Sequence, residues 1–220
     1  MRSIAITIVL IILAINTTWF VVHSAVLGWG DLTAAAPGTL SRVFATGSGL
    51  ATFGLALHMV AGAVLTIGAP LQAIPAYRAR WPGGHRRSGY LLFGLAILTG
   101  FGGLSYILLN GTIGGWWMSG WFALYGALMI WAAINTVYFA LDKDMVRHGA
   151  WATRLIILAV GSWIYRMHYV IWYGLTDGAA SNAAFTGLFD QIQVVAFFVP
   201  YLLIAEVFLR RRPAARRALV

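Results

Sequence analysis

Only 10% of the 220 residues are charged and 60% are hydrophobic, with a mean hydropathy of +0.81. A soluble domain of this length would carry about 25% charged residues, so the composition excludes a soluble globular protein and indicates an integral membrane protein. The net charge of +9 would suggest nucleic-acid binding in a soluble protein. Here the basic residues lie in short segments between apolar runs, so we expect contact with membrane lipids and none with nucleic acid. The chain has no cysteine, which excludes disulfides, thiolate-bound iron–sulfur clusters and covalent c-type haem.

Six apolar runs reach the length of about 20 residues that a membrane-spanning helix needs. They cover about residues 3–28, 45–73, 89–110, 117–141, 151–174 and 189–209. The first run is too long for the hydrophobic region of a signal peptide and lacks a clear cleavage site. We therefore expect it to be a membrane-spanning helix as well, which makes six spans in all. The chain is therefore predicted to be an all-α integral membrane protein with one transmembrane domain. The second to fifth spans would form a four-helix core, with the first and sixth at its periphery.

The distribution of lysine and arginine predicts the orientation of these spans. If the N-terminus is cytoplasmic, every lysine and arginine except Arg42 and Arg166 lies on the inner side. This asymmetry follows the positive-inside rule and predicts that both ends of the chain are cytoplasmic. The aromatic pairs Trp116–Trp117 and Trp172–Tyr173 then fall near the outer boundary, where interfacial aromatic residues are enriched.

Two histidines are expected at the inner surface. The segment RARWPGGHRRSGY, residues 78–90, reads as a cytoplasmic loop and places His85 just before the third span. His148 precedes the fifth span in the same way. The two side chains share one depth and would converge if these spans are neighbours. The alternative for each is a loop histidine that meets lipid headgroups among arginines.

Three further histidines are predicted to lie in the outer half of the membrane, at His23, His58 and His168. Ionisable groups at this depth are costly and usually face the bundle interior. Gly54 and Gly62 share a helical face with His58, which leaves room either for a flat macrocycle or for another helix packed closely against it. His168 is expected to be either a cofactor ligand or a structural histidine bonded to a neighbouring helix, and His23 is expected to be structural.

One arginine is predicted to lie inside a span. Arg166 in the fifth span needs an anion or backbone carbonyls as partners. Asp190 at the start of the sixth span is the expected partner in an ion pair that would fix the last two spans. The alternative is that Arg166 binds a haem propionate or an anionic substrate headgroup.

A series of spaced polar residues resembles a bacterial family of membrane proteins of unknown function. The resemblance covers roughly residues 50 to 170 and rests on a helix-two histidine, a glutamine, a basic loop and a later histidine–arginine group. The matching positions are His58, Gln72, Pro82, His85, Arg86, Gly89, Tyr90, His148, Trp151, Arg154 and Arg166. The family is itself distantly similar to transmembrane haem proteins of the cytochrome b561 type. The resemblance implies a multi-pass protein of the bacterial cytoplasmic membrane.

The resemblance also implies where haem would bind. Proteins of the b561 type hold two b haems between paired histidines in a four-helix core. His85 and His148 would be the inner pair, and His58 would pair with His168 at the outer side, because the fourth span has no histidine. Arg86, Arg154 and Arg166 would be available for propionates. The sequence is compatible with two haems, one or none.

Three functions are compatible with these features. The first is a b-type haem protein, a transmembrane oxidoreductase or electron carrier that works with a quinone or a small reductant. The second is a cofactor-free accessory or assembly subunit of a larger membrane complex. The third is a proton-coupled transporter with a histidine relay, which the lack of mid-membrane acidic residues disfavours. We expect them in this order.

Overall fold

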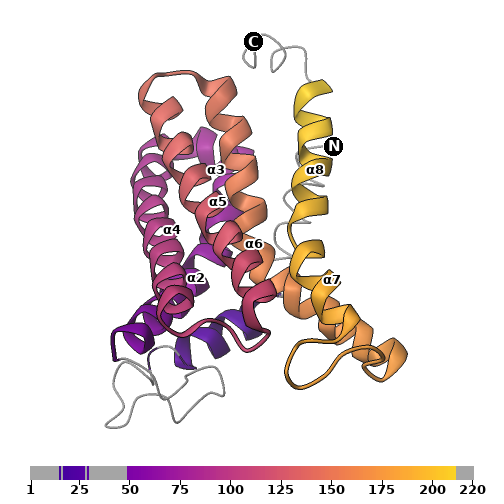
Figure 1. Ribbon diagram of the computed structural model, residues 1–220. Coiled ribbons are helices and arrows are strands. Elements are labelled where there is room, and N and C mark those ends of the chain that lie inside the picture. The colour runs from indigo at the N-terminus through magenta and orange to yellow at the C-terminus, as the bar shows by residue number, and fades with distance from the viewer. Residues whose placement is uncertain (1–14, 16, 28, 30–48, 212–220) are drawn as a thin grey trace.

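The structure, a computed structural model, describes residues 15, 17–27, 29 and 49–211 (Figure 1). Over this part of the chain every regular element is a helix. An apolar helix covers Thr17–Leu27. The elements that follow are α2 (Gly49–Gln72), α3 (Pro75–Arg80), α4 (Pro82–Asn110), α5 (Gly115–Leu141), α6 (Met145–Thr176), α7 (Leu188–Ala196) and α8 (Val199–Arg211).

Five segments within the described residues are long and apolar enough to cross a membrane. Four of them are α2, α4, α5 and α6, and the fifth is Leu188–Arg211, which contains α7 and α8. They correspond to the second to sixth predicted spans and confirm a multi-pass helical membrane protein. Of the first predicted span, 3–28, only the helix Thr17–Leu27 and Ile15 are described, and the rest lies outside the described residues.

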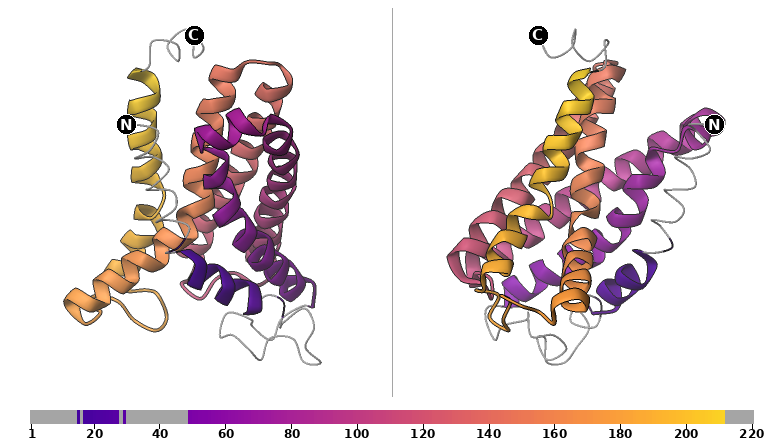
Figure 2. Two further views of the ribbon diagram at one scale, coloured as in Figure 1. Left: turned by 180° about the vertical axis from the view of Figure 1, so that it is seen from behind. Right: turned by 90° about the vertical axis from the view of Figure 1, so that its right-hand side faces the viewer.

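Helices α2, α4, α5 and α6 form a closed ring. Each packs against the next in the order α2, α4, α5, α6, and α6 packs back against α2 (Figure 2). A hydrogen bond from Thr66 Oγ1 to Ala159 O, at 3.0 Å, joins α2 and α6 inside this ring. The sixth predicted span lies outside the ring, because α7 contacts α5 and α6 while α8 contacts α6. The predicted four-helix core is therefore present, with the last span at its periphery.

One end of the bundle carries most of the positive charge, and we call it the basic end. The turn between α5 and α6 lies there, as does the end of α8 (Figure 1). His85, at the start of α4, is within electrostatic range of Arg78 in α3 and of His148 in α6. Because His148 lies just after the turn between α5 and α6, α3 and the start of α4 lie at the same end.

Two core helices begin earlier than the hydropathy predicts. Helix α4 begins at Pro82 rather than at residue 89, so most of the segment predicted as a cytoplasmic loop is helical. Pro75 and Pro82 each occupy the first position of a helix, where the missing N–H costs nothing. Helix α6 begins at Met145 rather than at residue 151. His85 and His148 therefore belong to the first turns of these helices and do not precede them.

Asp144 caps the start of α6. Its carboxylate accepts hydrogen bonds from Val146 N and Arg147 N, at 3.1 and 2.9 Å. We expect Asp144→Ala to lower the free energy of unfolding by about 1 kcal/mol, the usual effect of losing an N-cap. Thermal unfolding of the detergent-solubilised protein, followed by tryptophan fluorescence, measures the change. Asp144→Asn should retain most of the stability, since asparagine also caps helices well.

The sixth predicted span, 189–209, is not one continuous helix. It breaks at Phe197 and Phe198, between α7 and α8, where the chain changes direction (Figure 1). Pro200 explains the break, because it cannot donate a hydrogen bond to Ala196 O and its ring clashes with that carbonyl. Both phenylalanines are fully buried and belong to the main hydrophobic core.

Candidate functional site

Two of the predicted site histidines lie at the basic end. His85 comes from α4 and His148 from α6, which are diagonal helices of the four-helix ring. The two imidazoles are within electrostatic range of each other, and both are half-buried. The expectation that these histidines converge at one depth agrees with this arrangement, although their helices are diagonal rather than adjacent.

A backbone carbonyl orients His148. Its Nδ1 lies 2.8 Å from Thr136 O in α5. Because a carbonyl only accepts hydrogen bonds, Nδ1 carries the proton and the neutral ring keeps its lone pair on Nε2. Histidines that bind metals are commonly held in this way, with the second nitrogen fixed by a carbonyl or a carboxylate.

His85 lies beside a small polar cluster that contains two buried atoms without partners. Gln72 Nε2 donates to Ser88 Oγ at 2.8 Å, and the Tyr77 hydroxyl lies 2.9 Å from the same oxygen. Tyr77 also meets the edge of the His85 ring, with centroids 6.1 Å apart. Gln72 Oε1 and His85 Nδ1 have no hydrogen-bond partner among the described residues. Each buried unpaired group costs about 1–3 kcal/mol, so this cluster favours a bound group that would pair with them.

Sequence reasoning missed two members of this cluster. Tyr77 and Ser88 were not among the predicted site residues, whereas Gln72 entered only through the family resemblance. Ser88 lies one helical turn after His85, so its position on the same face was a usable signal once residues 82–90 are read as helix. Tyr77 had no such signal, because α3 was predicted as loop.

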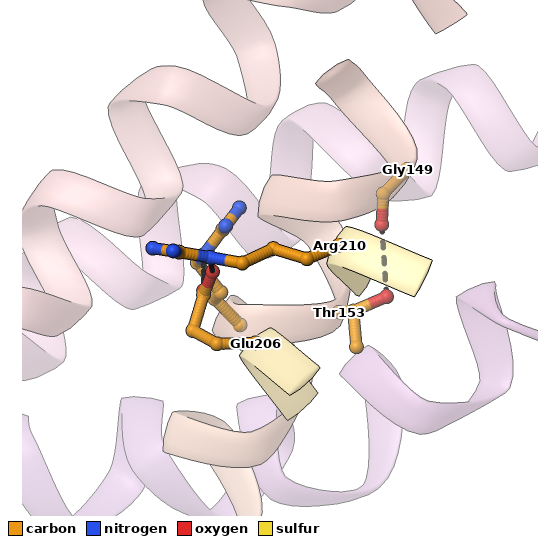
Figure 3. A network of polar contacts seen from close by, with 5 residues as sticks. Gly149, Thr153, Glu206 and Arg210 are labelled. Carbon is orange, nitrogen blue, oxygen red and sulfur yellow. Dashed lines mark hydrogen bonds and ion pairs between the residues drawn. The ribbon is translucent and has the colours of Figure 1, made fainter. Parts of the chain in front are cut away.

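The predicted propionate-binding arginines at this end have different surroundings. Arg86 is exposed, with its guanidinium 5.9 Å from the centre of the Tyr90 ring. Arg154 is paired already, since its Nε lies 2.6 Å from Glu206 Oε1 and its guanidinium lies over the Trp151 ring. Glu206 also lies 3.8 Å from Arg210 (Figure 3). This ion-pair network fastens α8 to α6.

His58 takes part in close helix packing. Its Nδ1 donates to Thr99 O in α4 at 2.7 Å. A Cβ atom added at Gly54 would lie 2.3 Å from Ser105 Oγ, and one added at Gly102 would lie 2.4 Å from Gly54 O. The glycine face of α2 is therefore filled by α4. This packing agrees with the alternative of close helix packing, and it leaves no space at Gly54 for a flat macrocycle.

His168 is fully hydrogen-bonded. Its Nδ1 lies 3.0 Å from Gln193 Oε1 and its Nε2 lies 2.9 Å from the Tyr201 hydroxyl. These contacts join α6 to α7 and α8, as expected of a structural histidine. His168 is bonded to α7 and α8, whereas His58 is bonded to α4, so the two histidines of the predicted outer pair have partners on different helices.

Arg166 and Asp190 do not form the predicted ion pair. Asp190 is fully buried and accepts four hydrogen bonds, none of which comes from Arg166. Oδ1 accepts from Tyr169 Oη and Ser181 Oγ, and Oδ2 accepts from the backbone N–H of Asn182 and Gly187. These donors come from α6 and from the connection before α7, and they already satisfy the carboxylate.

The geometry therefore separates the predicted ligands into two groups. Only His85 and His148 combine a shared location with ring nitrogens that have no protein partner. Among the described residues, no group of three or more histidine and acidic side chains is placed to hold a metal ion. A haem needs only two axial nitrogens from the protein, so the residues of the basic end fit it, whereas those around His58 do not.

The chain matches no protein-family model, and comparison with curated proteins and with solved structures finds no similar chain.

Proposed function

We propose that this chain is a b-type haem protein of the bacterial cytoplasmic membrane, with one haem bound between His85 and His148. In this proposal six helices cross the membrane and both ends of the chain are cytoplasmic, so the basic end faces the cytoplasm. The observation that carries the proposal is the pair of histidines on diagonal helices, one with Nδ1 fixed by Thr136 O and the other with Nδ1 unpaired in a buried position.

A haem bound here would supply a reversible one-electron change at its iron. The chain's own residues would hold and tune it. The Thr136 carbonyl keeps His148 in the tautomer that presents Nε2 and increases the basicity of that nitrogen. Arg78 brings positive charge near the site, which favours the propionates and a reduced iron. A quinone in the inner leaflet or a small cytoplasmic reductant would be the electron partner.

A second candidate function is a cofactor-free accessory subunit of a larger membrane complex. The observation in its favour is that three predicted cofactor residues have protein partners. His58 is bonded to Thr99, His168 to Gln193 and Tyr201, and Arg154 to Glu206.

The two functions differ in a visible spectrum. We expect purified protein from cells given a haem precursor to show a reduced-minus-oxidised b-type spectrum and one haem per chain by pyridine haemochrome. His85→Ala and His148→Ala should each remove nearly all of this haem, because a b haem here would lose an axial ligand. His168→Ala is the matched control and should retain it. Folded protein without haem would leave the accessory subunit as the better account.

A further inference from the structure

Arg166 places a permanent positive charge close to the middle of the membrane. It lies in α6, between Arg154 near the basic end and Trp172 near the opposite end. Its Nη1 donates to Ser162 O at 3.0 Å, so the side chain turns back by one helical turn. At 1.5 Å per residue, Ser162 is about 12 Å from Arg154 and about 15 Å from Trp172. The guanidinium is therefore near the centre of a hydrocarbon layer about 30 Å thick.

The contacts of Arg166 satisfy only part of its hydrogen-bonding capacity. Besides the Ser162 carbonyl, its guanidinium lies over the ring of Phe20, 4.5 Å from the centroid. A guanidinium has five N–H donors, and neither partner carries a negative charge. The side chain is exposed at the surface between α6 and the helix Thr17–Leu27.

The acidic residues of the chain do not provide a counter-ion in the part that the structure describes. Asp190 is satisfied by four other donors, Glu206 pairs with Arg154, and Asp144 caps α6. Asp142 and Asp177 follow the ends of α5 and α6, far from mid-membrane. Asp31 is the sixth acidic residue and lies outside the described residues. An unpaired charge within a span marks a functional site by default.

We propose that Arg166 binds the carboxylate of a membrane-dissolved organic acid, such as a long-chain fatty acid, which enters from the lipid between α6 and the helix Thr17–Leu27. A carboxylate has two oxygens that match the guanidinium fork. A carboxylic acid crosses hydrocarbon in its neutral form, and the proton that it releases on pairing with the arginine passes to water at the membrane surface. A phospholipid phosphate is held at the interface by its glycerol backbone, about one leaflet thickness away. The site, at the level of Ser162, is about 21 Å along α6 from His148, so this inference is independent of the haem proposal.

The test uses a diazirine-bearing stearic acid as a photoaffinity probe, with the full chain in phosphatidylcholine vesicles. We expect labelling to map to the peptides that contain Phe20 and Ser162. Oleate should compete for this labelling, whereas methyl oleate, which has the same chain but no charge, should not. Arg166→Gln should reduce the labelling about tenfold, since it removes a charge-assisted pair. Arg166→Lys should retain a large part of it.

Arg147→Gln is the matched control, because it removes the same charge from the same helix at the membrane surface. The probe should label this variant to the same extent as the unchanged protein. Three results would overturn the proposal: equal competition by methyl oleate, equal labelling by a diazirine phosphatidylglycerol, or stronger labelling after Asp31→Asn. The first indicates a merely apolar surface, the second a phospholipid headgroup site, and the third an internal ion pair that occupies Arg166. Gel filtration of each variant confirms that it is folded.

Discussion

Replacing Gly102 by alanine is expected to destabilise the protein by about 3 kcal/mol, at the upper end of the usual effect of overpacking. The added Cβ would lie 2.4 Å from Gly54 O and 3.1 Å from the His58 backbone nitrogen. Both atoms belong to the backbone of α2, so no side-chain rotation relieves the contact. The two helices would have to separate, which also stretches the hydrogen bond from His58 to Thr99 O.

Gly94→Ala on the same helix is the control for this substitution. A Cβ at Gly94 meets no heavy atom within 4 Å. Alanine there should stabilise the helix by about 0.5–1 kcal/mol, because glycine is unfavourable in a helix interior. Thermal unfolding in detergent, followed by the fluorescence of the ten tryptophans, compares both variants. Equal stability of the two would show that α2 and α4 are not in close contact at Gly102.

Removing the Asp190 carboxylate is expected to have a similarly large effect. Asp190→Ala would leave four donors around this buried position without their acceptor, and we expect a loss of about 3 kcal/mol. Asp190→Asn should cost much less. Its amide oxygen can take the place of Oδ2 and accept from the backbone of Asn182 and Gly187. The hydroxyls of Tyr169 and Ser181 can then rotate to accept from the amide nitrogen.

The same unfolding measurement tests this order of stabilities. Asp177→Asn is the control, since Asp177 is exposed and asparagine tolerates its left-handed conformation with φ 53°. It should change the free energy of unfolding by less than about 0.5 kcal/mol. If Asp190→Asn and Asp190→Ala were equally destabilising, the carboxylate charge rather than the hydrogen bonds would hold the connection before α7.

The sequence predicted the spans well because hydropathy is a local property. The predicted starts of the spans were wrong. The arginines and glycines of the segment 78–90 are typical of a loop, although Pro82 is well suited to begin a helix. The prediction also failed at residues 197–198, because the apolar composition continues through the break that Pro200 causes. Composition decides which segment crosses the membrane, but proline position and capping decide where helices begin and end.

The candidate site was predictable only in part. The location of His85 and His148 at one end of the bundle was expected from their equal depth, which can be counted along the sequence, whereas the diagonal placement of their helices was not. The partners of His58, His168 and Asp190 depend on which neighbouring helix each side chain faces. Asp190 was assigned to Arg166 on charge and depth. Its two oxygens instead accept from two hydroxyls and from the backbone of residues 182 and 187, and no sequence pattern reveals these donors in advance.

The break before Pro200 has a consequence for how the chain is assembled. Helix α7 is about 13 Å long and α8 about 20 Å long, so neither crosses about 30 Å of hydrocarbon by itself. During synthesis the segment Leu188–Arg211 must therefore be inserted as a single unit. Phe197 and Phe198 reach their buried places only when α5 and α6 are already present to receive them. We therefore expect the last span to acquire its final shape after the four-helix ring has closed.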